Sequence, residues 1–115
     1  MMERRHEPRL EADLALRVWG IDVKGERFLQ EARARNISLT GALLSQLDAE
    51  LRSGDLIGIL YAGRKARYRV IWVCHSGNGQ KIQAAVHKLA EDACPWLDLL
   101  AAGEPASGFS VSPSP

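Results

Sequence analysis

Apolar and polar residues alternate along most of the chain, in short runs separated by turn-forming residues. In the first run Leu14, Leu16 and Val18 would share one face of a strand, opposite a more polar face. Comparable runs follow at 27–35, 42–44, 56–61, 65–73 and 81–87. Turn clusters containing glycine, such as Ser53-Gly54-Asp55 and Ser76-Gly77-Asn78-Gly79, separate several of them. The pattern therefore predicts five or six short antiparallel strands joined mainly by hairpins.

Individual runs carry further expectations about burial. The run 56–61 is apolar on both faces, which predicts a strand covered on two sides. In 65–73 the alternation turns Tyr68, Val70 and Trp72 to one face and arginines to the other. Aromatic residues at strand or helix spacing are more often core than base-stacking platforms, so we expect the three tryptophans in the core. These are Trp19, Trp72 and Trp96.

The pattern changes from strand to helix near the C-terminus. Pro95 suits the first turn of a helix, Trp96, Leu99 and Leu100 recur at helical spacing, and Gly103 lies just beyond. A short amphipathic helix should therefore cover one barrel opening. The segment 104–115 is rich in Ser, Pro and Gly, which predicts a disordered tail. We expect an all-β fold, and a small antiparallel barrel rather than a sandwich because closure removes exposed strand edges.

Composition limits the chain to one small domain without a strong electrostatic field. Its 115 residues are 46% apolar, and 15 basic residues nearly balance 14 acidic ones. Near neutrality argues against binding to bulk nucleic acid or to an anionic membrane. The start carries no apolar stretch resembling a secretion signal or a membrane span, so we expect no membrane insertion. With two cysteines, interpreted as free packing thiols (Cys74 and Cys94), a cytoplasmic location is the simplest hypothesis.

Two clusters do not look like ordinary barrel surface. The first is Arg4-Arg5-His6-Glu7-Pro8-Arg9, whose guanidinium groups can each hold a phosphate or a guanine edge through two hydrogen bonds. The second is Asn36-Ile37-Ser38-Leu39-Thr40-Gly41, which puts an amide, a hydroxyl and a glycine with unusual backbone freedom into one turn. Taken alone, the first is most often a solvated arm and the second ordinary turn chemistry.

Together the two clusters resemble the signature of the PilZ family, Arg-x-x-x-Arg followed by Asp/Asn-x-Ser-x-x-Gly. The resemblance continues through 41–44, the Gly54-Asp55 turn and the strand 69–73, and it covers Glu3 to about Leu100. It implies a six-stranded PilZ-like barrel that binds cyclic di-GMP. The site residues carried over from the motif are Arg4, Arg5, Arg9, Asn36, Ser38 and Gly41. The implied division is a flexible arginine-rich ligand-binding arm at 1–9, the barrel with its helix at 10–102 and the disordered tail at 103–115.

The resemblance also implies details of binding. Arg5 and Arg9 would grip phosphate and guanine, and the turn would receive a guanine base. Arg4 occupies a position that the family associates with two intercalated ligand molecules, so a ligand dimer is the favoured guess. Asn36 offers one acceptor where the family's aspartate offers two. Ala84 and His87 stand where relatives often have glycine and an aromatic residue, and the extra methyl of Ala84 could narrow the pocket.

The favoured hypothesis is a single-domain receptor and adaptor that changes arm conformation on binding and signals through an unidentified downstream protein. The first alternative is a small barrel that binds single-stranded nucleic acid, and the second is a PilZ-like interaction module without ligand. We expect no DNA partner, no cofactor other than the ligand and no metal, because no Cys/His spacing resembles a zinc site. Ser38 lacks a nearby histidine or paired carboxylate, so enzyme activity is not expected.

Overall fold

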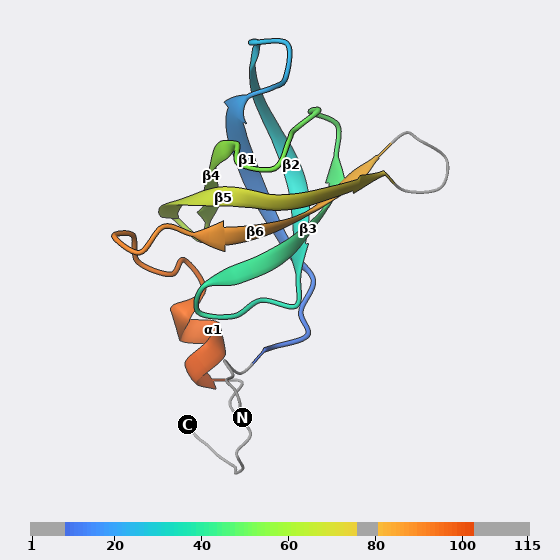
Figure 1. Cartoon of the computed structure of the whole chain (residues 1–115). Coiled ribbons are helices and arrows are strands. Elements are labelled where there is room, and N and C mark those ends of the chain that lie inside the picture. Colours follow the sequence, from blue (N-terminus) through green and yellow to red (C-terminus); the bar gives the residue numbers. More distant parts are fainter. Residues whose placement is uncertain (1–8, 76–80, 103–115) are drawn as a thin grey trace, which may run out of the picture.

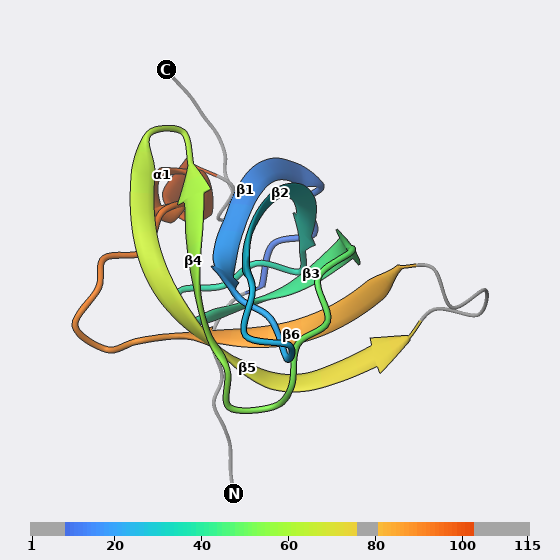
Figure 2. The same cartoon turned by 90° about the horizontal axis from the view of Figure 1, so that it is seen from above.

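The computed structural model describes residues 9–75 and 81–102 (Figure 1). The elements are β1 (Leu14–Ile21), β2 (Arg27–Arg35), β3 (Gly41–Leu47), β4 (Leu56–Tyr61), β5 (Arg64–His75), β6 (Ile82–Lys88) and α1 (Leu97–Ala102). The strands close into a six-stranded barrel in the order β1-β2-β3-β6-β5-β4, and each neighbouring pair is antiparallel. The predicted all-β barrel with a short C-terminal helix is confirmed, and Figure 2 shows the strands curving around one interior.

Alternate residues of the strands fill that interior. In β1 the inward residues Leu16 and Val18 are buried and the intervening Arg17 is exposed, as the sequence pattern predicts. Leu44 of β3, Ile59 of β4 and Tyr68 of β5 are fully buried in the same core. Closure therefore lets one face of every strand contribute to a single apolar interior, while the other face remains outside.

The alternation fails in the second half of β5. Val70 pairs with Val86 but Trp72 pairs with Ala85, so Ile71 is an extra residue in a β-bulge. A bulge reverses the face on which the following side chains lie. Trp72 is consequently 46% exposed and Cys74 is also exposed. The predictions that Trp72 lies in the core and that Cys74 is a packing residue were wrong. Cys94, by contrast, is buried.

The predicted two-sided burial of 56–61 is right for only part of β4. Ile57, Gly58 and Ile59 are buried, but Leu56 is 44% exposed. Gly58 faces outward and is covered by the indole of Trp19 from β1, since a Cβ on Gly58 would overlap that ring. One aromatic side chain, rather than a second layer of structure, therefore covers the middle of this strand.

The segment before α1 closes one end of the barrel. Trp96 is 1% exposed, and its ring lies 5.7 Å from that of Tyr68 and 6.5 Å from that of Tyr61. Leu99 and Leu100 of α1 also pack against the core. The helix begins at Leu97, two residues after the predicted start at Pro95. Figure 1 shows α1 at the end of the barrel opposite the β1–β2 hairpin.

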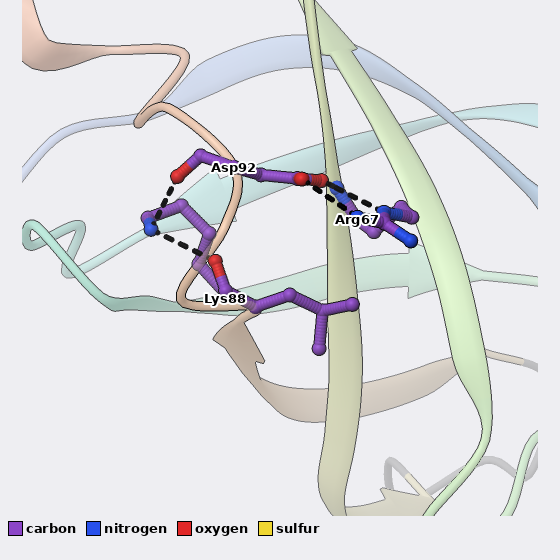
Figure 3. Close-up of polar contacts among 4 residues, drawn as sticks. Arg67, Lys88 and Asp92 are labelled. Atoms are coloured by element: carbon purple, nitrogen blue, oxygen red, sulfur yellow. Dashed lines mark hydrogen bonds and ion pairs between the residues drawn. The ribbon is translucent and has the colours of Figure 1, made fainter.

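A polar cluster fastens the loop between β6 and α1 to the barrel (Figure 3). The Asp92 carboxylate accepts hydrogen bonds from the Arg67 backbone amide, Nε and Nη2 at 2.6, 3.0 and 2.9 Å. Lys88 Nζ donates to the carbonyls of Leu89 and Asp92 at 3.0 and 2.6 Å. The Arg67 guanidinium lowers the pKa of Asp92 to about 2. The loop that delivers Trp96 is therefore anchored to β5.

Several sequence-based predictions fall outside the described residues. Arg4 and Arg5, the turn at 76–79 and the predicted disordered tail at 103–115 belong to this group. Within residues 9–75 and 81–102, no helix is long and apolar enough to span a membrane.

Candidate functional site

The end of the arm is joined to the motif turn by an isolated bridge. Leu10 N–H donates to the Ile37 carbonyl at 2.8 Å, and Ile37 N–H donates to the Leu10 carbonyl at 3.0 Å. Ile37 is fully buried, which anchors the turn in the core, whereas Arg9 is exposed. Because Arg9 directly precedes Leu10, the bridge brings a guanidinium-bearing residue alongside the segment 36–41. Arg9, the one described residue of the first cluster, thus lies next to the second cluster although 27 residues separate Arg9 from Asn36 in the sequence.

The turn between β2 and β3 begins with a left-handed residue. Asn36 has a φ of 49°, a conformation that asparagine adopts more readily than most other residues. Within the described residues Gly41 is not among those with positive φ. The conformational freedom that the sequence suggested for Gly41 is therefore needed at Asn36 instead.

Gly41 is required for a different reason. A Cβ at this position would lie 2.9 Å from the Val86 carbonyl oxygen of β6. Real Cβ atoms essentially never approach backbone oxygen so closely, so a side chain here would push β3 away from β6. The glycine of the motif lets the two strands pair closely at the base of the turn.

Ser38 holds the turn together from inside. Its hydroxyl accepts the Gly41 N–H at 3.1 Å and the Thr40 N–H at 3.4 Å, and the side chain is almost completely buried. Its carbonyl accepts the Trp96 Nε1–H at 2.8 Å and the Cys94 thiol at 3.8 Å. Ser38 therefore shapes the turn and ties it to the segment before α1, and its hydroxyl already has partners within the protein.

An open hollow of about 590 Å³ lies beside this turn. It is lined by residues of the bridge segment, the end of β2 and β3, namely Glu11, Ala12, Asp13, Arg35, Asn36 and Leu43. A second hollow of about 380 Å³ shares Asp13 and Arg35 with the first and continues along β2 and β3 to Gln46 and Lys81. Together they form a continuous polar surface on the outside of the barrel.

Charges of both signs line the first hollow. Arg33 Nε bonds Asp13 Oδ1 at 2.9 Å, and this hydrogen bond holds the pKa of Asp13 below its usual value. Arg35 and Glu11 form no ion pair with another described residue. A polar ligand at the hollow would therefore meet a guanidinium and a carboxylate that are in no ion pair with another described residue, next to the Asn36 amide.

Sequence reasoning identified only some of the residues at this candidate site. Arg9, Asn36, Ser38 and Gly41 lie together as their motif suggests, and Arg4 and Arg5 lie outside the described residues. Sequence reasoning missed Glu11, Asp13 and Arg35. The outward alternation of Glu31, Arg33 and Arg35 in β2 was the available signal, because it marks a charged face that ends at the turn.

The expectation about Ala84 was wrong. Ala84 is fully buried and pairs with Leu44 and Val73, so its methyl group faces the core and does not narrow the outer hollow. His87 does lie on the outer face, where it pairs with Gly41 and is exposed. The variation on β6 therefore affects the outer surface through His87 alone.

Among the described residues no group of three or more His, Cys, Asp or Glu side chains could hold a metal ion. The chain matches no protein-family model, no curated protein and no solved structure. The chemistry of the hollow therefore rests on the residues themselves.

Proposed function

We propose that this protein is a receptor for cyclic di-GMP of the PilZ type. The observation that carries the proposal is the bridge between Leu10 and Ile37, which brings the arm that ends at Arg9 to the turn that begins at Asn36. These are the two halves of the motif on which the resemblance rests. An isolated arm or an isolated turn would have an ordinary structural explanation, whereas the pairing of Leu10 with Ile37 beside an open polar hollow lined by Asn36 favours a shared ligand.

The groups around the hollow match the chemistry of the ligand. Arg35, which lines the hollow, and Arg9, which precedes the bridge beside the turn, can form paired hydrogen bonds with phosphate oxygens or with the O6/N7 edge of guanine. The Glu11 carboxylate is suited to accept hydrogen bonds from the guanine N1–H and amino group. It would supply the second acceptor that an aspartate at position 36 would have and that Asn36 lacks. In this proposal Glu11 and Arg35 act together with the motif residues.

The proposed mechanism is a change in the position of the arm. The ligand would hold the arm against the turn, because it shifts a conformational equilibrium by binding one arrangement more tightly than the other. The hydrogen bond from Trp96 to the Ser38 carbonyl gives the turn a direct contact with the segment before α1. A downstream protein that recognises the ordered arm or this segment would receive the signal.

Calorimetric titration with cyclic di-GMP, and in parallel with cyclic di-AMP and GMP, tests the proposal. Adenine replaces the O6 acceptor by an amino group, which costs about 1–3 kcal/mol for each lost bidentate pair, or roughly 5–150-fold in affinity. Arg9→Ala should weaken binding strongly, while Arg52→Ala removes an exposed arginine from the turn before β4 and should have no effect. Equal affinities for the guanine and adenine ligands would refute the proposal.

A second candidate follows from Ser38. Its buried hydroxyl is already bonded within the turn, so the Asn-x-Ser-x-x-Gly pattern also has a purely structural explanation. A PilZ-like interaction module without ligand would keep that pattern for folding alone. A folded protein that binds none of the three nucleotides at millimolar concentration would favour this second candidate.

A further inference from the structure

A patch of exposed apolar side chains lies on the outer face of β1, β2 and β4. Leu29 is 66% exposed, Ile21 56% and Leu56 44%. Trp19 lies on the same face, where it pairs with Leu29 on one side and with Gly58 on the other. A hollow of about 520 Å³ opens between Trp19 and Leu29. We call the four side chains Trp19, Ile21, Leu29 and Leu56 the apolar patch.

The floor of the apolar patch is held in place. Because a Cβ on Gly58 would overlap the Trp19 indole, the ring lies against the β4 backbone and does not project from the surface. The hollow beside it is lined by Phe28 and Gly20 as well as by members of the patch. Exposed apolar patches that are rimmed by polar residues mark interaction sites in soluble proteins when they are large.

Positive charges frame the apolar patch on the same outer face. Arg27 pairs with Ile21, and Arg69 pairs with Leu56. On β1, Arg17 lies two residues before Trp19, and it pairs with a residue of β4 that in turn pairs with Lys65 of β5. None of these four cations forms an ion pair with another described residue. Glu31, opposite Arg17, is the one acidic residue in these paired rows. An occupant that carries acidic groups around apolar ones would therefore complement the surface.

The fold limits how an occupant can bind. Along the patch β1 is paired on both sides, with β2 and with β4, whereas among the described residues the part of β2 that carries Leu29 pairs only with β1. The Gln30 side chain occupies this edge of β2 through hydrogen bonds with the backbone of Gln46, Asp48 and Ala49, so we expect binding to use side chains on the outer face. Neighbouring strands lie about 4.8 Å apart and alternate residues of a strand about 6.6 Å apart. Helix residues at i and i+3 or i+4 lie about 5–6 Å apart, which matches that spacing.

We propose that the apolar patch is the docking surface for an acidic amphipathic helix of a partner protein. The proposal does not depend on ligand binding, because the patch lies toward the β1–β2 hairpin, at the end of the barrel opposite α1 and the 36–41 turn (Figure 1). A second copy of this chain is a poorer occupant, since a twofold contact would bring the same arginines face to face. A membrane is poorer because Trp19 lies flat instead of projecting.

A titration followed by amide NMR tests the docking surface directly. The probe is a synthetic 18-residue helical peptide with leucines at i, i+3 and i+7 and glutamates on its flanks, and the matched peptide carries lysines in place of the glutamates. The acidic peptide should shift the amides of β1, β2 and β4 and the Trp19 indole N–H, and bind at least about tenfold more tightly than the lysine peptide.

Variants of exposed residues provide the controls. Leu29→Ser should lower affinity for the acidic peptide about tenfold, and it should leave the fold intact because the side chain is mostly exposed. Ile71→Ser removes another exposed apolar side chain (48%) from the bulge in β5 and should change nothing. Absence of binding, equal affinity for both peptides, or indifference to Leu29→Ser would overturn the proposal.

Two further measurements separate the other occupants. Sedimentation of the full chain would show a dimer that Leu29→Ser converts to monomer if the occupant were a second copy. Flotation with vesicles containing phosphatidylserine would show binding that Leu29→Ser abolishes if the occupant were a membrane. Either result would overturn the proposal of a partner helix. A chain that is monomeric and does not bind the vesicles would support it.

Discussion

Asn36 combines a demanding backbone conformation with a position at the edge of the polar hollow. Its φ of 49° would cost a residue such as alanine roughly 1 kcal/mol, whereas glycine adopts it without strain. The two possible reasons for this asparagine, backbone geometry and ligand contact, can therefore be separated by choosing the replacement.

Asn36→Gly should keep the thermal stability of the protein and still lower affinity for cyclic di-GMP about tenfold, because it removes the side-chain amide. Asn36→Ala should lose the same affinity and also roughly 1 kcal/mol of stability. Asn36→Asp should bind more tightly than the natural chain, since a carboxylate offers two acceptors. Thermal melts and calorimetry measure both properties, and normal binding by Asn36→Gly would exclude a ligand contact for this residue.

Tyr68 presents a separate problem inside the barrel. Its side chain is fully buried beside Trp96, yet its hydroxyl has no hydrogen-bond partner among the described residues. Burial raises the pKa of this phenol well above its usual range. A buried hydroxyl without a partner costs about 1–3 kcal/mol.

Tyr68→Phe should therefore raise the free energy of unfolding by about 1 kcal/mol, because it removes the hydroxyl and keeps the ring. Urea denaturation measures the change. Tyr61→Phe is the matched control, since Tyr61 also packs its ring near Trp96 but is only half-buried, and it should have little effect. A loss of stability in Tyr68→Phe would mean that the hydroxyl is satisfied.

At the scale of elements, the cluster that joins β5 to the loop before α1 should make stability depend on pH. The pKa of Asp92 is lowered from 3.8 to about 2, chiefly by the side-chain hydrogen bond from Arg67. A carboxylate with a lowered folded-state pKa stabilises the fold above its unfolded pKa and loses this effect as the pH falls toward the folded value. The window for this loss is therefore about pH 4 to 2.

Asp92→Asn should lower the melting temperature at pH 7 and flatten its decline between pH 4 and pH 2. Asp98→Asn is the control, because Asp98 bonds the exposed guanidinium of Arg64 at the surface of the molecule, where ion pairs contribute little. Melting curves at pH 7, 4, 3 and 2 compare the three proteins. A natural chain and an Asp92→Asn variant with parallel curves would rule out the anchoring role of this carboxylate.

The elements themselves were largely predictable, because alternating apolar residues and glycine turns carry enough information to fix strands and barrel closure. The bulge at Ile71 was not, since the run Val70-Ile71-Trp72-Val73 is apolar on both faces and gives no sign of where the register shifts. Half of the candidate site was predictable from its motif. Glu11 was missed because one bridge, Leu10 to Ile37, brings it to the turn, and a single pairing leaves no period in the sequence. Arg35 directly precedes the turn, and its signal was the charged outward face of β2.

At the scale of the whole molecule, the number of bound ligands remains a prediction that depends on Arg4, which lies outside the described residues. Two intercalated cyclic di-GMP molecules bring four phosphate charges close together, and a cation nearby offsets their repulsion. The natural chain should therefore take up two ligands, whereas Arg4→Leu should take up close to one and show a weaker dependence on salt.

Calorimetric stoichiometry at several salt concentrations decides this point, with Arg52→Leu as the control for the loss of one exposed charge. A natural chain that binds one ligand would remove the argument for Arg4. The proposed receptor function would remain, because it rests on Arg9 and the turn at Asn36.

The closed ring of strands also governs how the chain reaches its folded state. Four of the six pairings join strands that are consecutive in the sequence. The other two, β1 with β4 and β3 with β6, join strands that have two other strands between them in the sequence. Such non-local pairings form slowly, because the entropy of closing a long loop is lost before their contacts are gained. Until both have formed, the ring has open edges that can pair with other chains. We therefore expect aggregation to compete with folding at this late step, and to stop once the ring is complete.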